Sequence, residues 1–131
     1  MSQHYDNPDV MSYTFPLEHD MGAGTGTAFS IKGPKGKKGR LLDVGVHVTE
    51  TFTADTTPAY VRVGSPTDAD AYAQLQMDLA AITNFWNTVD DTDAIISADL
   101  AADTQIEVAS VAPTGGTPAG KGYIFLSVGW Y

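Results

Sequence analysis

The sequence predicts an all-β protein: an antiparallel β-sandwich of about eight strands with a jelly-roll-like topology. The clearest support is alternation, because apolar and polar residues exchange at every second position over several segments, as in strands with one buried face. These segments recur at intervals of ~8–12 residues, and turns rich in the chain's 13 Gly and 7 Pro residues separate them. With 131 residues, 43% hydrophobic and 18% charged, the chain is long enough to bury one core.

The chain is predicted to divide into an extended N-terminal arm, residues 1–12, and a single β-sandwich domain, residues 13–131. The first part is polar, contains Pro8 and shows no apolar period. Chain ends of this kind become ordered when a partner ties them down.

Two short strands are expected early in the domain, at Tyr13–Leu17 and Thr27–Lys32. A glycine-rich connection, Met21–Thr27, lies between them, and a basic loop, Gly33–Gly39, follows them. Both stretches lack the full spacing of a dinucleotide-binding or phosphate-binding motif, so we interpret them as loops.

The strongest strand signal runs from Leu41 to Thr53. The two-residue period places one apolar set on the same face: Leu42, Val44, Val46, Val48 and Phe52. His47 falls on the opposite, polar face. Because this strand is long, we expect a β-bulge in it, at Gly45. A turn, Ala54–Pro58, and a second strand, Ala59–Val63, complete an antiparallel hairpin.

Residues 65–86 fit two interpretations. Ser65-Pro66-Thr67-Asp68 has the form of a helix start, and Leu75, Leu79, Ile82 and Trp86 fit a helical spacing. The run from Ala71 to Leu79 also alternates as a strand does. Because the surrounding chain is β, we favour a short turn near Asp68–Ala71 followed by a strand, and the choice between strand and helix stays open.

The last strand, Gly122–Tyr131, is apolar on both faces. Shorter segments precede it at Ala94–Ser97 and Thr104–Ala112. A strand with two apolar faces needs a cover on both sides. The domain core supplies one cover, and another copy of the chain is a candidate for the other. The residues expected to take part in this self-association are Tyr123, Phe125, Trp130 and Tyr131.

Charge is unevenly distributed along the chain. The net charge is −9, yet five of the seven basic residues fall between Lys32 and Arg40. So acidic a surface repels nucleic acid, and the basic stretch lacks the interleaved aromatic residues of a single-strand binder. We therefore expect no nucleic-acid partner. No apolar run approaches the ~20 residues of a membrane span, so no membrane partner is expected either.

No catalytic or metal motif stands out. The chain has no Cys, which excludes a disulfide, a thiol nucleophile and a Cys-bound zinc. Its three His residues, His4, His19 and His47, lie in no recognisable catalytic pattern. The run Asp91-Thr-Asp93 fails the spacing of a calcium loop, although a weak surface Ca²⁺ site at Asp90, Asp91 and Asp93 stays open. We expect no enzyme activity and no cofactor.

Several stretches resemble small structural proteins encoded in the head-gene modules of tailed bacteriophages. They are Gly39–Gly64, Asp70–Ala73, Ala102–Val108, Val111–Gly120 and the closing Gly-Trp-Tyr. The resemblance covers roughly residues 39–131. It implies a jelly-roll-like decoration, or cement, protein that binds the outer surface of an icosahedral capsid and stabilises it by bridging shell subunits. That group has no catalytic motif to match, so no functional site residue is carried over from it.

The resemblance also implies partners and a location. The partners would be the major capsid protein and the chain itself, as a homotrimer or, alternatively, a dimer. The protein would be made in the host cytoplasm and end in the virion. The residues expected to contact the capsid are His4, Tyr5, Asn7 and Pro8 in the arm, with Lys35, Lys37, Lys38 and Arg40 in the basic loop. Alternative functions are another virion part, such as a head fibre base or tail protein, and a carbohydrate-binding module using Trp86 or Trp130.

Overall fold

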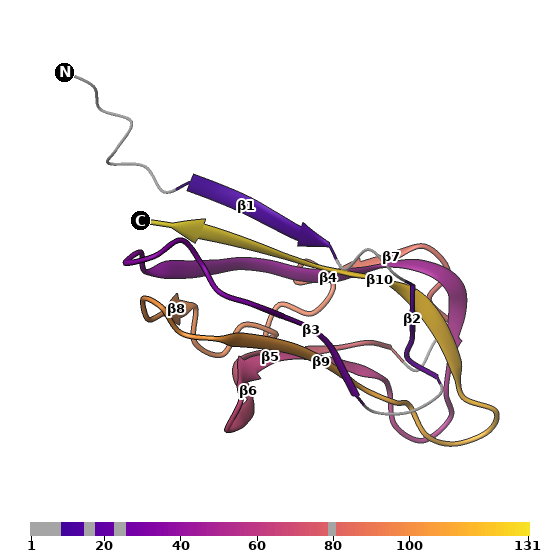
Figure 1. The fold of residues 1–131 in the computed structure, drawn as a ribbon. Helices are drawn as coiled ribbons and strands as arrows, with labels where there is room; N and C mark the ends of the chain where they lie inside the picture. The colour runs from indigo at the N-terminus through magenta and orange to yellow at the C-terminus, as the bar shows by residue number, and fades with distance from the viewer. Residues whose placement is uncertain (1–8, 15–17, 23–25, 79–80) are drawn as a thin grey trace.

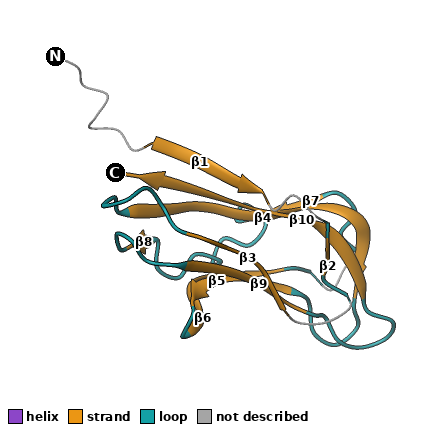
Figure 2. Cartoon of the chain, viewed as in Figure 1, coloured by secondary structure: helices purple, strands orange, loops and turns teal. Residues whose placement is uncertain are grey.

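The protein is all-β in the computed structural model, which describes residues 9–14, 18–22, 26–78 and 81–131. Those residues form ten strands and no helix (Figure 2). The strands are β1 (Asp9–Thr14), β2 (His19–Asp20), β3 (Gly26–Ile31), β4 (Gly39–Thr53), β5 (Tyr60–Ser65), β6 (Asp68–Gln76), β7 (Phe85–Asn87), β8 (Asp99–Leu100), β9 (Ile106–Val111) and β10 (Ala119–Trp130).

Two antiparallel sheets stack as layers (Figure 1). Sheet A has the order β1-β10-β4-β7, with β2 beside β10 and β8 beside β4, and sheet B has the order β3-β9-β5-β6. If the two-residue strands β2 and β8 are set aside, the other eight pair first with last: β1 with β10, β3 with β9, β4 with β7, and β5 with β6. A long hairpin rolled into two sheets gives this pairing, so the predicted sandwich of jelly-roll type is confirmed.

The core fills the space between the sheets. Its residues come from alternate positions of the central strands, as the two-residue period requires. The side chains that are at most 1% exposed include Val44, Val46, Val61, Val63, Leu75, Ile106, Val108, Ile124, Leu126 and Val128. Branched aliphatic side chains dominate this set because they pack well on a pleated surface.

The bulges in β4 do not occur where we predicted one. Gly45 lies opposite Phe125 in regular register, whereas the register shifts where Ser127 pairs with Asp43 and Val128 pairs with Leu41. Leu42 is therefore the extra residue, and it is 43% exposed while Leu41 is 2% exposed. The inner face of β4 thus includes Leu41 instead of Leu42. A bulge adds one residue, so positions on its far side face the opposite way from those that strict alternation predicts. A prediction that assumes one unbroken two-residue period therefore misses the change.

The ambiguous segment contains a strand. β6 extends from Asp68 to Gln76 and pairs with β5. The turn is at Pro66-Thr67, slightly before the predicted position, and the Ser65 hydroxyl accepts a hydrogen bond from the Asp68 amide at 3.1 Å. That contact explains the helix-like start, since a capping hydroxyl also stabilises a tight turn.

The predicted boundary between arm and domain falls inside β1. Residues 9–12 pair with β10, from Asp9 opposite Trp130 to Ser12 opposite Ser127. The long strand β10 supplies hydrogen-bonding partners for a segment whose own sequence carries little strand signal. Residues 1–8 lie outside the described part of the chain.

Candidate interaction surfaces

Three aromatic rings gather on the outer face of sheet A, on the side away from the core. His47 of β4, Phe85 of β7 and Phe125 of β10 have ring centroids 5.0, 5.2 and 5.6 Å apart. We call these three residues the ring cluster. His47 is exposed and Phe85 is 41% exposed, so the cluster presents apolar surface to solvent.

The strand register builds the ring cluster. His47 lies opposite Tyr123 on one side and Phe85 on the other, which places these side chains in a row across the sheet. Phe125 lies opposite Gly45, and a Cβ at Gly45 would be 2.5 Å from the Phe125 ring. Gly45 therefore lets that ring lie flat against β4, close to His47.

The ring cluster can bind an apolar protein surface, but it carries no nucleophile or metal-ligand set. Asp43, an acid of the same strand β4, accepts hydrogen bonds from the Asn87 amide group at 3.1 Å and the Thr88 hydroxyl at 2.7 Å. Exposed aromatic patches of this kind commonly mark sites of protein contact.

The basic segment, Lys32–Arg40, lies at the end of the sandwich where β4 begins and β10 ends. Lys38 and Tyr131 exchange two backbone hydrogen bonds of 2.9 Å, and the Gly36 amide donates to the Asp103 carboxylate at 2.9 Å. The loop is thus fixed to its neighbours by its backbone.

Most cations of the basic segment are exposed. Lys35 and Lys38 are exposed and Lys37 is half-buried. Arg40 pairs with Asp99 at 3.2 Å, but both side chains are largely exposed, so the pair contributes little to stability. This end of the molecule can therefore attract an acidic surface.

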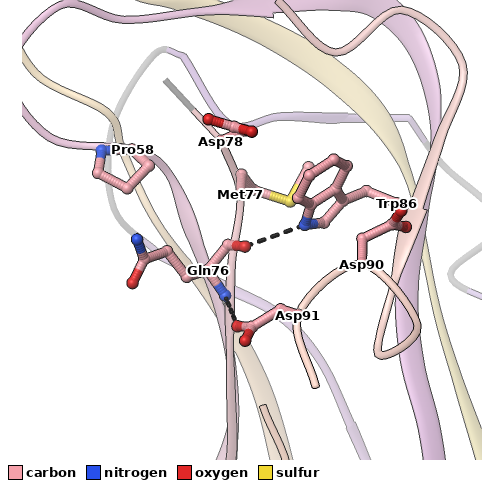
Figure 3. Close-up of a pocket in the computed structure, with 7 residues that line it drawn as sticks. All are labelled: Pro58, Gln76, Met77, Asp78, Trp86, Asp90 and Asp91. Carbon is pink, nitrogen blue, oxygen red and sulfur yellow. Dashed lines mark hydrogen bonds between the residues drawn. The ribbon is translucent and has the colours of Figure 1, made fainter. Parts of the chain in front are cut away.

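A pocket of about 360 Å³ opens between β6 and the turn after β7 (Figure 3). Several polar groups that line it are already hydrogen-bonded within the protein. The Asp91 carboxylate accepts from the Gln76 amide at 2.8 Å, and Trp86 Nε1 donates to the Gln76 carbonyl at 2.9 Å. The Asp90 carboxylate accepts from the Asn87 amide at 3.0 Å. Within the described residues no group of three or more His, Asp or Glu side chains is placed to hold a metal ion.

The four residues predicted to self-associate occupy different environments. Tyr123 and Phe125 are half-buried on sheet A, and Tyr131 is 56% exposed. Trp130 is 2% exposed, and its indole Nε1 donates to the Tyr13 hydroxyl at 2.8 Å. Its side chain is enclosed by this chain and offers no surface to a second copy. The arm residues His4, Tyr5, Asn7 and Pro8 lie outside the described residues.

Two features were not predicted from the sequence. Phe85 belongs to the ring cluster but lies inside the ambiguous segment, residues 65–86, where its face was not assigned. His19 falls between the predicted strands Tyr13–Leu17 and Thr27–Lys32, yet it lies in β2 and its Nε2 is 2.7 Å from the hydroxyl of Ser110 in β9. This hydrogen bond links the two sheets and satisfies the hydroxyl of Ser110, which is fully buried.

No helix capable of crossing a bilayer occurs in the described ranges. No family model and no curated protein matches this chain.

Solved structures do share its fold. A chain in the acidic stable capsid structure of Helicobacter pylori bacteriophage KHP30 aligns with 92% of this chain and 91% of its own length, at 16% identity and a TM-score of 0.50. A chain in the cyanophage Pam1 capsid asymmetric unit aligns with all of this chain and 90% of its own length, at 15% identity and a TM-score of 0.52. Both neighbours come from phage capsid structures. At these identities the likeness shows a common fold.

Proposed function

We propose that this chain is a structural protein of a bacteriophage head, a decoration or cement protein that binds the outer surface of the capsid and bridges shell subunits. The observation that carries the proposal is the jelly roll itself, shared over at least 92% of this chain with chains in two phage capsid structures. The sequence resemblance to phage head proteins supports the same role.

The two surfaces suit such a role. The basic segment lies at one end of the molecule and would steer that end onto an acidic patch of the shell. The ring cluster lies on a broad side of the sandwich, where it would pack against a neighbouring subunit of the head. Repetition over a symmetric shell multiplies weak contacts, so neither surface needs high affinity alone.

The predicted arm would add a further contact with the shell. Removing residues 1–8 tests this contact without cutting into β1, whose first residue is Asp9. We expect the shortened chain to keep its unfolding midpoint and to bind shells more weakly. Equal binding would show that the arm makes no contact with the shell.

The copy number of this chain in purified particles, measured by quantitative mass spectrometry against the major capsid protein, tests the proposed function. Decoration predicts about one copy per one to three shell subunits. A handful of copies per particle would assign the chain to a vertex, head fibre or tail. Absence from particles would overturn a virion role.

A matched pair of variants tests the ring cluster. Phe85→Ala removes an exposed ring from the cluster, whereas Val89→Ala removes an exposed apolar side chain outside it, 79% exposed. We expect Phe85→Ala to weaken binding to undecorated shells about tenfold, as for a moderate interface hot spot. Val89→Ala should bind as the parent does. Equal binding by the two variants would remove the ring cluster from the interface.

A further inference from the structure

The outer edges of the two sheets are not equally protected. The edge of β6 is covered by the segment that follows β7: the Gln74 amide donates to the Ala94 carbonyl at 2.8 Å, and the Ile96 amide donates to the Tyr72 carbonyl at 2.9 Å. β3 carries a register shift between Thr27 and Phe29, which makes its edge irregular. β7 and β8 are only three and two residues long. Short strands, bulges and covering segments are the usual means by which proteins block edge pairing.

β1 has none of these protections. All six of its residues pair with β10 without a register shift. Among the residues that the structure describes, no strand pairs with its other side. Asp9 is its one formally charged residue, and Met11 is 42% exposed beside the edge. A regular, nearly uncharged edge with exposed apolar surface is a template for another strand.

We propose that β1 pairs antiparallel with β1 of a second copy of this chain, about a two-fold axis, so that the two A sheets become one continuous sheet. The main-chain N–H and C=O groups of the free edge would supply the bonds. A two-fold contact needs one self-complementary patch, and an antiparallel strand pair provides it.

The side chains of β1 select the register. Tyr13 faces the inner side, where its hydroxyl meets the Trp130 indole, and Ser12 faces the outer side, where its hydroxyl lies 3.2 Å from that of Ser127. In a continuous sheet, opposed residues share a face, so residues of equal parity must pair.

One register satisfies this condition and leaves Asp9 unopposed. It places Ser12 opposite Ser12 of the second copy and Met11 opposite Tyr13 of the second copy. Each exposed Met11 then packs on an aromatic ring, a favourable sulfur–aromatic contact. The other five-residue register would place Asp9 opposite a Tyr13 side chain. The small carboxylate content of this edge is what allows two chains of net charge −9 to meet there.

Cysteine cross-linking in the free protein tests this register. The chain has no cysteine, so a single introduced thiol reports on one position. In Ser12→Cys the two Cα atoms would lie about 4.5–5.5 Å apart, within disulfide range. In the control, Thr14→Cys, each thiol would face Val10 of the second copy, about 14 Å along the strand from its counterpart. Ser12 and Thr14 both lie on the exposed edge strand, so the variants are matched.

Under mild oxidation we expect Ser12→Cys to form a disulfide-linked dimer at least tenfold faster than Thr14→Cys. The wild-type chain should show a concentration-dependent dimer in sedimentation equilibrium. Equal cross-linking rates, or faster linking of Thr14→Cys, would overturn the proposal, as would a monomer at every concentration. The inference goes beyond the proposed function, and because the test uses no particles, its failure is distinct from absence of the chain in virions.

Discussion

At the level of the residue, the packing of the basic segment, Lys32–Arg40, depends on the ring of Trp130. Its ring fills the space between sheet A and the start of the basic segment, where Gly33 and Gly39 lie against it. A Cβ on Gly33 would be 2.4 Å from the ring, and one on Gly39 would be 2.6 Å away. The Tyr13 hydroxyl accepts the indole N–H, so the buried polar group is satisfied.

Substitution of Gly33 tests this packing. Gly33→Ala should lower the free energy of unfolding by about 1–3 kcal/mol, because the added methyl group forces a large, enclosed ring to move. Gly26→Ala is the control, since nothing lies within 4 Å of a Cβ at that position. It should change stability by no more than about 0.5 kcal/mol. Urea denaturation measures both, and equal effects would show that Trp130 does not restrict the loop.

At the level of the element, the bulge at Leu42 decides which side of β4 is buried. Leu41 and Leu42 are chemically identical neighbours with 2% and 43% exposure. Leu41→Ala should cost about 2–5 kcal/mol, as for a buried leucine, and Leu42→Ala no more than about 0.5 kcal/mol. A strand with the regular alternation that the sequence suggests would bury Leu42 instead of Leu41, and Leu42→Ala would then be the more destabilising substitution. Chemical denaturation of the two variants therefore distinguishes the bulged strand from the unbulged one.

At the level of the whole molecule, basic residues lie at both ends of β10. The basic segment lies beside its last residues, and Lys121 lies near its start, paired with Glu50 at 3.8 Å. Changing Lys35 and Lys38 to Gln should slow binding to shells about tenfold at low salt, because electrostatic steering sets the association rate. Lys121→Gln should have little effect, and salt should reduce the difference. Equal association rates for the two variants would exclude steering by the basic end.

The global architecture was easier to predict than its local details. Alternation in β4 and β10 and the spacing of turns led to the sandwich, since both depend on neighbouring residues. The bulge at Leu42 could not be found because it depends on how Val128 pairs across the sheet. The start of β1 escaped for the same reason, as its partner is more than a hundred residues away.

The candidate surfaces were also predicted only in part, because they too depend on pairing between distant residues. The basic segment is visible as a run in the sequence, and the outer position of Phe125 follows from the parity of its strand. The ring cluster also needs Phe85, which only pairing with β4 brings beside His47. Trp130 was expected on a contact surface because its strand has two apolar faces. Gly33 and Gly39, which are far from it in sequence, leave space for its ring, so the ring is enclosed by this chain.

The central position of β10 in sheet A has a consequence for synthesis on the ribosome. β1, β2 and β4 all pair with β10, so sheet A cannot be completed before residues 119–130 have been made. Until then a nascent chain carries Val44 and Val46 on a strand without its main partner. Folding must therefore be late and dominated by contacts between distant residues, which slows it and lengthens the period in which a chaperone can bind.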